Sequence, residues 1–488
     1  MTASRTILLI AWLVSNTLLC AQSVHYSEEI KFSIRSGDTK IIGKSRGLVY
    51  VHVVSKAGSE IIAYRPNMTQ HLSKVIPLQN ESQKADQIFL RDSFFIVMHS
   101  AVERNVKSIG AKRFYLDVTP DSPEVLIDTF VRSVLSSMPQ YRFTESNDRS
   151  KLLAYYTRSQ GDGELLSFAV LNNDLQILHR DQVAIPSDGK RTRLQDAHVS
   201  DAGEVIVVIT EYVDGSTTAS KRFSILRSGD RFASNEQFSA EPEARWLNNL
   251  MFKVDDHNGN IVAAGFFSTD PRRMQSAEGV YFGVFSLATG RRASENFLAF
   301  APEFIAKIKG TRQSRLTDRL YTFILDEIIL RHDGGVVIVA ESYLKSVRPR
   351  SSPTITDPYG PYTFGETSTT YYFEELLVMS LTPTGEVHWK NILIKSQVSS
   401  GDNGRFSSYI TMNTGSRICF IFNDEVRYRT NVIQYIVYPE GDLDREIIFN
   451  SRKYDLYLMP QLGKQVSARE MVIPSYKRGK LRFVKMDY

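Results

Sequence analysis

The chain contains almost no cysteine: among its 488 residues only Cys20 and Cys419 are present. A pair so far apart excludes the disulfide-dense frameworks of small secreted domains. The fold must therefore be held by a hydrophobic core, for which the 42% apolar content is ample. Cys419 lies in the apolar stretch RICFIF, which predicts a buried and inert thiol.

The chain also lacks the short motifs that identify common enzyme classes. It contains no HExxH, GxSxG, GxxxxGK[ST] or GxGxxG, and its nine histidines are scattered along the sequence. The formal net charge of +5 is small for this length and gives no argument for a nucleic-acid partner. We expect no metal and no cofactor. With 54 Asp and Glu residues, no catalytic residue can be selected from the sequence alone.

Only the N-terminus carries a long apolar run, which spans Thr6–Leu19 after the basic residue Arg5. The run is followed by LLCAQS, which predicts a signal peptide over residues 1–21 with cleavage after Ala21. Lipidation of Cys20 is the alternative, although Leu19 is bulky for a lipobox. We expect an exported protein of the periplasm or the cell surface, without a transmembrane segment after signal removal.

A turn followed by an apolar strand recurs along the chain. DAGEVIVVITEYV (201–213), HNGNIVAAGFFS (257–268) and DGGVVIVAESYL (333–344) align on the small residues Gly203, Gly259 and Gly335. Related strings occur at Ser150 and Gly415, and each is followed by a second strand that also ends in a turn. Such turns supply residues that tolerate positive φ, and the apolar runs after them are typical of buried strands.

These units recur at roughly 40–55 residues, about eight times in the chain, which is the sequence signature of a β-propeller. We predict an all-β fold with one propeller over residues 22–488. About eight blades are expected, with seven as the alternative, and a multi-domain β-sandwich is the competing fold. The segment EEIKFSIR (28–35) is expected to pair with the last blade and close the ring.

Two stretches predict minor peripheral helices. SPEVLIDTFVRSVLSSM (122–138) places its apolar residues on one helical face behind a Ser122 cap. ENFLAFAPEFIAKIKG (295–310) is split by Pro302. Both are expected to pack on the outside of a blade.

From residue 320 onward the sequence resembles a known group of chains. LYTFILDEIILRHDGGVVIVAESYL, YYFEELLVMSLTPTGEVHWKNILIKSQ and ICFIFNDE are similar to exported, uncharacterised propeller-like proteins of the Bacteroidota, most clearly over 320–488. Glu374 and Glu375 depart from the pattern of that group. The resemblance implies an exported propeller-like protein and implies no activity.

The insertion at 345–370, KSVRPRSSPTITDPYGPYTFGETSTT, is the candidate binding site. It is expected to hang between two strands of one blade, and loops of this length are usually either functional or disordered. Tyrosine and arginine are enriched at recognition surfaces, and aromatic faces suit sugar rings. The candidate residues are Arg348, Arg350, Tyr359, Tyr362 and Phe364. Variable decoration without function is the alternative.

Weaker motifs favour structural roles. SGDNGRF (400–406) partly matches the Asp-box turn of sialidase-like propellers, but Phe406 stands where threonine is expected. DDHNGN (255–260) begins like a calcium loop, but position 12 would be Phe267 instead of a glutamate. The basic clusters DGKRTR (188–193) and KRGK (477–480) are interpreted as solvated loop tips, although several on one rim could meet an anionic polymer.

The sequence therefore predicts a non-catalytic binding or scaffold protein of the cell envelope, which recognises a protein or glycan through propeller-rim loops. The alternative is a hydrolase or lyase that acts on a glycan in the central funnel. Two carboxylates or an arginine cluster in that funnel would favour the enzyme. A funnel filled by apolar and small residues would favour the binding protein.

Overall fold

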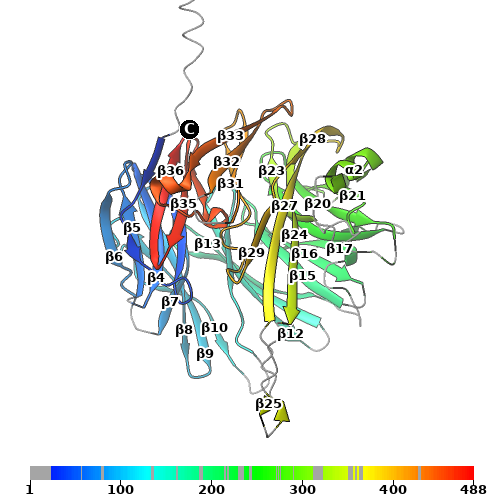
Figure 1. Ribbon diagram of the computed structural model, residues 1–488. Coiled ribbons are helices and arrows are strands. Elements are labelled where there is room, and N and C mark those ends of the chain that lie inside the picture. The colour runs from blue at the N-terminus through cyan, green and yellow to red at the C-terminus, as the bar shows by residue number, and fades with distance from the viewer. Residues whose placement is uncertain are drawn as a thin grey trace, which may run out of the picture.

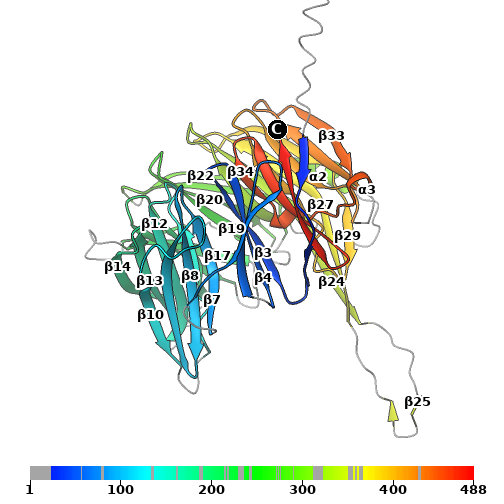
Figure 2. The same ribbon diagram turned by 90° about the vertical axis from the view of Figure 1, so that its left-hand side faces the viewer.

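The computed structural model shows antiparallel sheets arranged around a centre (Figures 1 and 2). It describes residues 23–488 except for 57, 79–81, 133–136, 161–162, 186–190, 214–215, 217–218, 229–235, 241–244, 271, 273, 275, 290, 311–322, 350–355, 358–359, 362–366 and 427–429. The expected signal peptide and Cys20 lie outside the described residues. Within them, no helix is long and apolar enough to cross a membrane.

The first three sheets are four-stranded meanders in which each strand pairs with the next along the chain. They comprise β3 (Asp38–Ser45), β4 (Leu48–Ser55), β5 (Gly58–Tyr64) and β6 (Gln70–Val75); β7 (Gln83–Leu90), β8 (Phe94–Glu103), β9 (Val106–Tyr115) and β10 (Val125–Val131); and β11 (Arg142–Glu145), β12 (Lys151–Gln160), β13 (Gly163–Asn172) and β14 (Ile177–Ile185).

The next sheet has eight strands. Its strands are β15 (Arg191–Val199), β16 (Val205–Tyr212), β17 (Ala219–Ser228), β18 (Glu236–Ala240), β19 (Trp246–Asp255), β20 (Asn260–Ser268), β21 (Gly279–Ser286) and β22 (Arg292–Ala299). The sheet contains two meanders that are joined by a short pairing between β17 and β19. Among the described residues, the two halves join through Ala219 and Ser220, which pair with Asn248 and Leu247.

The remaining sheets repeat this plan. They contain β23 (Phe323–Leu330), β24 (Val336–Pro349), β27 (Thr367–Leu381), β28 (Val387–Leu393) and β29 (Gln397–Ser400); then β30 (Ile410–Asn413), β31 (Ile418–Asn423), β32 (Asn431–Val437) and β33 (Leu443–Asn450); and last β34 (Lys464–Ser467), β35 (Glu470–Lys477) and β36 (Lys480–Asp487). A separate pair, β25 (Thr356–Asp357) with β26 (Gly360–Pro361), lies at the tip of the β24–β27 hairpin (Figure 2).

The N-terminal strands complete the last sheet. β1 (Ser23–Tyr26) and β2 (Ile30–Lys31) both pair antiparallel with β36. The expected closure by residues 28–35 is confirmed, and β1 extends it upstream. The two ends of the described chain are thereby joined in one sheet, so that the sheet that ends the chain depends on the residues that begin it.

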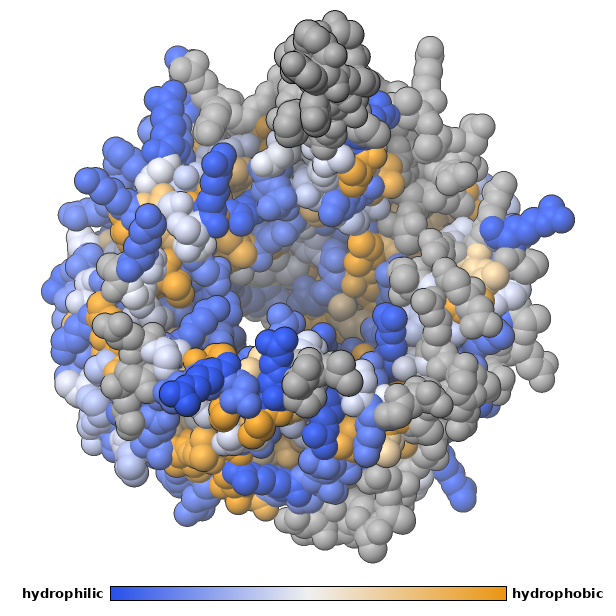
Figure 3. All heavy atoms as spheres, turned by 90° about the horizontal axis from the view of Figure 1, so that it is seen from below, coloured by the Kyte–Doolittle hydropathy of each residue, from blue (hydrophilic) through white to orange (hydrophobic). Residues whose placement is uncertain are grey.

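The first strand of each sheet lies toward the centre. β3 contacts β7 and β34, β34 contacts β30, β11 contacts β15, and β19 contacts β23. Viewed from below, the molecule surrounds a central hollow (Figure 3). Apolar side chains fill the space between neighbouring sheets, and the strands at the middle of each sheet are buried on both faces.

The predicted turn-and-strand repeat is confirmed. Gly203, Gly259 and Gly415 adopt positive φ in the turns between first and second strands. In the DGG turn the positive φ falls on Gly334 and not on Gly335, the glycine on which the repeats align. Cys419 is fully buried in β31, as predicted, and burial raises the pKa of its thiol to about 11.

The predicted helix over 122–138 is wrong, because residues 125–131 form β10. Residues 133–136 lie outside the described residues. The pairing with β9 skips Ile127, which makes a bulge between Leu126 and Asp128. The bulge buries both Ile127 and Phe130, and this spacing of three imitates the period of a helix.

The second predicted helix is half correct. Residues 295–299 belong to strand β22, whereas α2 (Pro302–Gly310) begins at the proline that was expected to split the segment. Proline is well suited to the first turn of a helix because the amide that it lacks has no intrahelical partner there. The other helical pieces are short: α3 (Ser451–Tyr454) and η1 (Pro460–Leu462).

The closure of the ring generates a stability prediction. Phe483 of β36 is fully buried and packs with Val49, Val51 and Tyr64 of the β3–β6 sheet. Phe483→Ala should lower the free energy of unfolding by about 3–5 kcal/mol, because it leaves a cavity between the first and last sheets. Urea denaturation measures this. Leu126→Ala, at a side chain that is 57% exposed, is the control and should change stability by less than about 0.5 kcal/mol.

Candidate functional site

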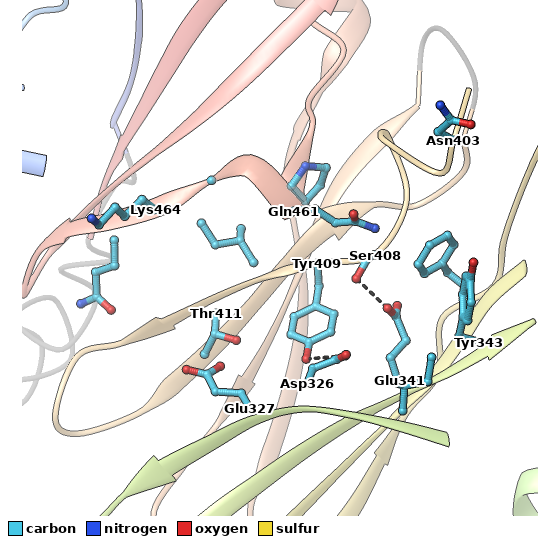
Figure 4. A pocket seen from close by; sticks show the side chains of 16 residues that line it. Asp326, Glu327, Glu341, Tyr343, Asn403, Ser408, Tyr409, Thr411, Gln461 and Lys464 are labelled. Atoms are coloured by element: carbon cyan, nitrogen blue, oxygen red, sulfur yellow. Dashed lines mark hydrogen bonds between the residues drawn. The ribbon is translucent and has the colours of Figure 1, made fainter. Parts of the chain in front are cut away.

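A pocket of about 860 Å³ opens where β23, β30 and β34 begin, on the side from which the β24–β27 hairpin projects. Its size is within the range of small-molecule sites. Acidic, hydroxyl, amide and aromatic side chains share its wall (Figure 4). The pocket is lined by Ile324, Asp326, Glu327, Glu341, Tyr343, Phe373, Asn403, Ser408, Tyr409, Ile410, Thr411, Pro460, Gln461, Gly463, Lys464 and Gln465.

A β-bulge brings two consecutive carboxyl groups into this pocket. Neighbouring residues of a regular strand point to opposite faces. In the pairing of β23 with β24 the register skips Asp326: Leu325 pairs with Ala340 and Glu327 with Val339. Asp326 and Glu327 therefore both line the pocket (Figure 4). Bulges next to functional sites commonly redirect a side chain in this way.

The pKa of the Asp326 carboxyl group lies near neutral pH. This group can be reached by solvent from the pocket, yet the surrounding protein is dense enough that burial raises its pKa to about 7. The negative charge of Glu341 adds to this rise, and the hydrogen bond from the Tyr409 hydroxyl, 3.1 Å from Oδ2, opposes it. Asp326 can thus act as a proton donor at neutral pH.

Glu327 lies in a different electrostatic environment. Burial raises the pKa of Glu327, but a hydrogen bond with Thr411 and the positive charge of Lys253 both favour its ionised form. Asp326 instead has Glu341 beside it, an anion that disfavours ionisation. The two adjacent carboxyl groups thus have different charged neighbours, which is the kind of arrangement that acid–base chemistry uses.

A buried ion pair supports the pocket from behind. Lys395 Nζ, which is completely buried, lies 2.5 Å from Glu341 Oε1, and Ser408 Oγ donates to Glu341 Oε2 at 2.6 Å. Lys395 also donates to Gln397, whose amide donates to the carbonyl of Asn423. Both oxygens of Glu341 are thus engaged, so this residue positions its neighbours and fixes a negative charge near Asp326.

The far end of the pocket is aromatic. The rings of Tyr343 and Phe373 have centroids 4.9 Å apart at the base of the β24–β27 hairpin. The Tyr371 hydroxyl donates to Asn403 Oδ1 at 3.2 Å, and a Cβ on Gly404 would come within 2.7 Å of the Phe373 ring. Gly404 also has positive φ, so this turn packs closely on the aromatic pair only because it has a glycine there.

The predicted insertion is shorter as a loop than the sequence indicated. Residues 345–349 extend β24 and 367–370 extend β27, and the pairing continues to Pro349 with Thr367. A predicted loop over the whole of 345–370 is therefore wrong at both of its ends, because the Val- and Thr-rich flanks continue the hairpin.

The structure places only one of the predicted site residues. Arg348 is exposed on β24, beyond the pocket. Arg350, Tyr359, Tyr362 and Phe364 lie outside the described residues. The pocket residues of this hairpin are Glu341, Tyr343 and Phe373, which sequence reasoning did not select.

The weaker motifs form turns. Residues 255–260 make the hairpin between β19 and β20, where Asn258 donates to the Asp255 carboxylate. In 400–406, Asp402 accepts from the amide of Gly404. The turns at His257 and His332 meet in space, with ring centroids 4.1 Å apart. Across the described part of the chain, no group of three or more His, Cys, Asp or Glu could hold a metal ion.

No protein-family model matches the chain, and no curated protein matches it in sequence. Among solved structures, the β-propeller domain of the Trilobed protease from Pyrococcus furiosus has a TM-score of 0.38 at 10% identity, with 87% of this chain and 98% of that one covered. The antiparallel meanders and the contacts between their first strands themselves define an all-β, propeller-like structure.

Two further solved structures have similar scores. A prolyl endopeptidase has a TM-score of 0.33 at 10% identity, with 83% of this chain and 54% of that one covered. An ulvan lyase, bound to -[GlcA(1-4)Rha3S]-, has a TM-score of 0.35 at 9% identity, with 82% and 90% covered. This chain thus spans about half of the endopeptidase. Likenesses at this level concern the strand arrangement and not the activity.

The raised pKa of Asp326 generates a prediction about stability and pH. The folded state holds this proton more tightly than the unfolded state, whose pKa is near 3.8. Stability is therefore lost as pH rises from about 4 to about 7. Asp326→Asn, which cannot ionise, should gain stability relative to the wild type at about pH 8 and lose that gain at about pH 4.

Urea midpoints of the two proteins at the two pH values measure this difference. Asp442→Asn, the same substitution at an exposed position, is the matched control. A gain for Asp326→Asn that is larger at pH 4 than at pH 8 would contradict the raised pKa.

Proposed function

We propose that the chain is exported and folds as one β-propeller of eight blades. The eight-stranded sheet supports this count, because its two meanders join at only two residue pairs and thus divide into two blades. Seven blades would require the two meanders to act as one sheet. The apolar run that ends before Ala21 supports export.

We further propose that the pocket lined by Asp326 and Glu327, here called the funnel pocket, binds and hydrolyses a glycan. The observation that supports this most strongly is a pair of carboxyl groups, Asp326 and Glu327, brought into one pocket by a bulge and held in different electrostatic environments. Two carboxylates in the funnel are the feature expected of a glycan-active enzyme. Their presence in one pocket therefore favours a hydrolase over a non-catalytic binding protein.

The proposed reaction is acid–base hydrolysis. Asp326 gives its proton to the glycosidic oxygen as the bond from that oxygen to the anomeric carbon breaks. The Glu327 carboxylate takes a proton from a water molecule, whose oxygen forms the new bond to the anomeric carbon. The products are two shorter sugars. Asp326 is left ionised and Glu327 protonated, and exchange with solvent restores both.

The rest of the pocket is suited to a sugar chain. Tyr343 and Phe373 provide aromatic surface for the apolar C–H face of a ring. Gln461 lines the same pocket, and its side-chain amide can exchange hydrogen bonds with sugar hydroxyl groups. Such a mixture of aromatic and convergent polar groups is typical of small-molecule sites.

Release of reducing ends from a panel of polysaccharides tests this function. With a cleaved substrate, Asp326→Asn should lower kcat by about 10²–10⁴-fold because it removes the proton donor. Wild-type activity should fall as pH rises above about 7, where Asp326 ionises. Asp442→Asn, in an exposed turn, should leave kcat unchanged. Full activity of Asp326→Asn would overturn the assignment of this residue.

The second candidate is recognition of a protein partner through the projecting hairpin. Its base carries an exposed apolar row across three strands: Leu344 pairs with Tyr372, which pairs with Val398. Leu344 and Val398 are 37% and 50% exposed, and Val347, further out on the hairpin, is 55% exposed. Contiguous exposed apolar side chains are typical of interaction surfaces.

Removal of residues 346–369, with Lys345 joined to Thr370 through Asn-Gly, separates the two candidates. The shortened strands can close through a tight turn, so the fold should be retained. If the outer hairpin recognises a partner, affinity capture from the native envelope should recover that partner with the full chain and not with the shortened one. The row of Leu344, Tyr372 and Val398 remains in the shortened chain, so Leu344→Ser combined with Val398→Ser tests that row. Equal recovery by all three proteins would show that the hairpin is decoration.

A further inference from the structure

A second pocket of about 400 Å³ lies between the third and fourth meanders, and its character is basic and tyrosine-rich. It is lined by Gln140, Arg142, Tyr155, Tyr156, Thr157, Glu164, Arg193, Leu194 and Tyr212. Arg142 is the first residue of β11 and Arg193 the third of β15, two first strands that contact one another. The pocket therefore opens where first strands begin, as the funnel pocket does.

The two arginines are only partly compensated by acidic groups. Within the described part of the chain neither forms an ion pair. The Asp196 carboxylate interacts electrostatically with Arg142. The same carboxylate also has His198 Nε2 at 3.1 Å, so Arg142 is not its only neighbour. Glu164 also lines the pocket, so the pocket wall itself contains one carboxyl group and two guanidinium groups. Both arginines are exposed and can reach a ligand.

Three tyrosines form the rest of the wall. Tyr155 and Tyr156 are almost fully buried, and the Tyr212 hydroxyl donates to Gln195 Oε1 at 2.8 Å. Burial raises the pKa of Tyr155 and of Tyr212, so both rings are neutral at physiological pH. The wall thus combines rigid aromatic surface with positive charge, whereas the funnel pocket combines aromatic surface with carboxyl groups.

We infer that Arg142 and Arg193 bind an anionic group of a glycan, either the carboxylate of a uronic acid or a sulfate ester. A planar guanidinium group forms paired hydrogen bonds with such oxygen acids, and two of them converge here. The tyrosine rings supply a surface for the sugar that bears the anion. Arg193, the last residue of the basic cluster DGKRTR, is then part of a site.

This inference rests on the proposed function in one respect: it takes the anion to be carried by a sugar. The anion site itself is separate from the funnel pocket, because none of its residues lines that pocket. Arginine variants therefore test the anion site, and Asp326→Asn tests hydrolysis.

The experiment is calorimetric titration of the full chain with oligogalacturonate at physiological salt. The fully methyl-esterified oligomer, which has the same rings without charge, and inorganic sulfate are the comparison ligands. Arg142→Gln and Arg193→Gln should each weaken binding of the acidic oligomer by about tenfold or more, because each removes charged hydrogen bonds. Arg469→Gln, an equal loss of charge at an exposed turn, is the control.

Preference for the acidic over the esterified oligomer, lost in both arginine variants and competed by inorganic sulfate, would support the site. Binding that is unchanged in the arginine variants, or weakened equally by Arg469→Gln, would overturn it. Binding of inorganic sulfate without binding of either the acidic oligomer or a sulfated oligosaccharide would overturn the assignment to a glycan. Asp326→Asn should keep the preference for the acidic over the esterified oligomer, so loss of hydrolysis and loss of the anion site are separate outcomes.

Discussion

The whole molecule depends on one constraint: each meander is apolar on both faces and must have a neighbour on each side. The middle strands of the sheets are buried throughout, so no sheet can end the array. A ring meets this requirement without a capping unit. The ring closes because β1 and β2, at the start of the described chain, pair with β36 at its end. Stacking of sheets thus requires that the two ends of the chain meet.

A ring of this kind places its first strands around a hollow, and their exposed edges are where polar chemistry can be located. The bulge at Asp326 is one use of that freedom. Carboxyl groups at such an edge need charged partners in the protein behind them. The buried ion pair of Lys395 and Glu341 supplies these partners. Breaking a buried pair is costly because the remaining charge has no partner. The ion pair is therefore better understood as a support for the pocket than as a source of stability.

The sequence predicted the fold more completely than it predicted the site. Strand repeats, glycine turns and the closing segment follow from local spacing, which a single chain shows directly. The bulges at Ile127 and Asp326 do not: a skipped register changes which face a residue occupies, and this depends on the pairing partner. At Ile127 the skipped register gave a strand the apolar spacing of a helix, so the sequence predicted a helix there. At Asp326 it concealed two carboxyl groups on one wall, among 54 acidic residues that look alike in sequence.

The same reasoning shows why the two pockets belong together. Both form where first strands begin, so both face the end of the ring from which the long hairpin projects. One presents carboxyl groups beside aromatic rings, and the other presents guanidinium groups beside aromatic rings. Charges of opposite sign at one opening favour a ligand that is itself heterogeneous, with an anionic group at one place and an uncharged linkage at another. An acidic glycan has that distribution: its anionic groups suit Arg142 and Arg193, and its uncharged glycosidic bond suits the protonated Asp326.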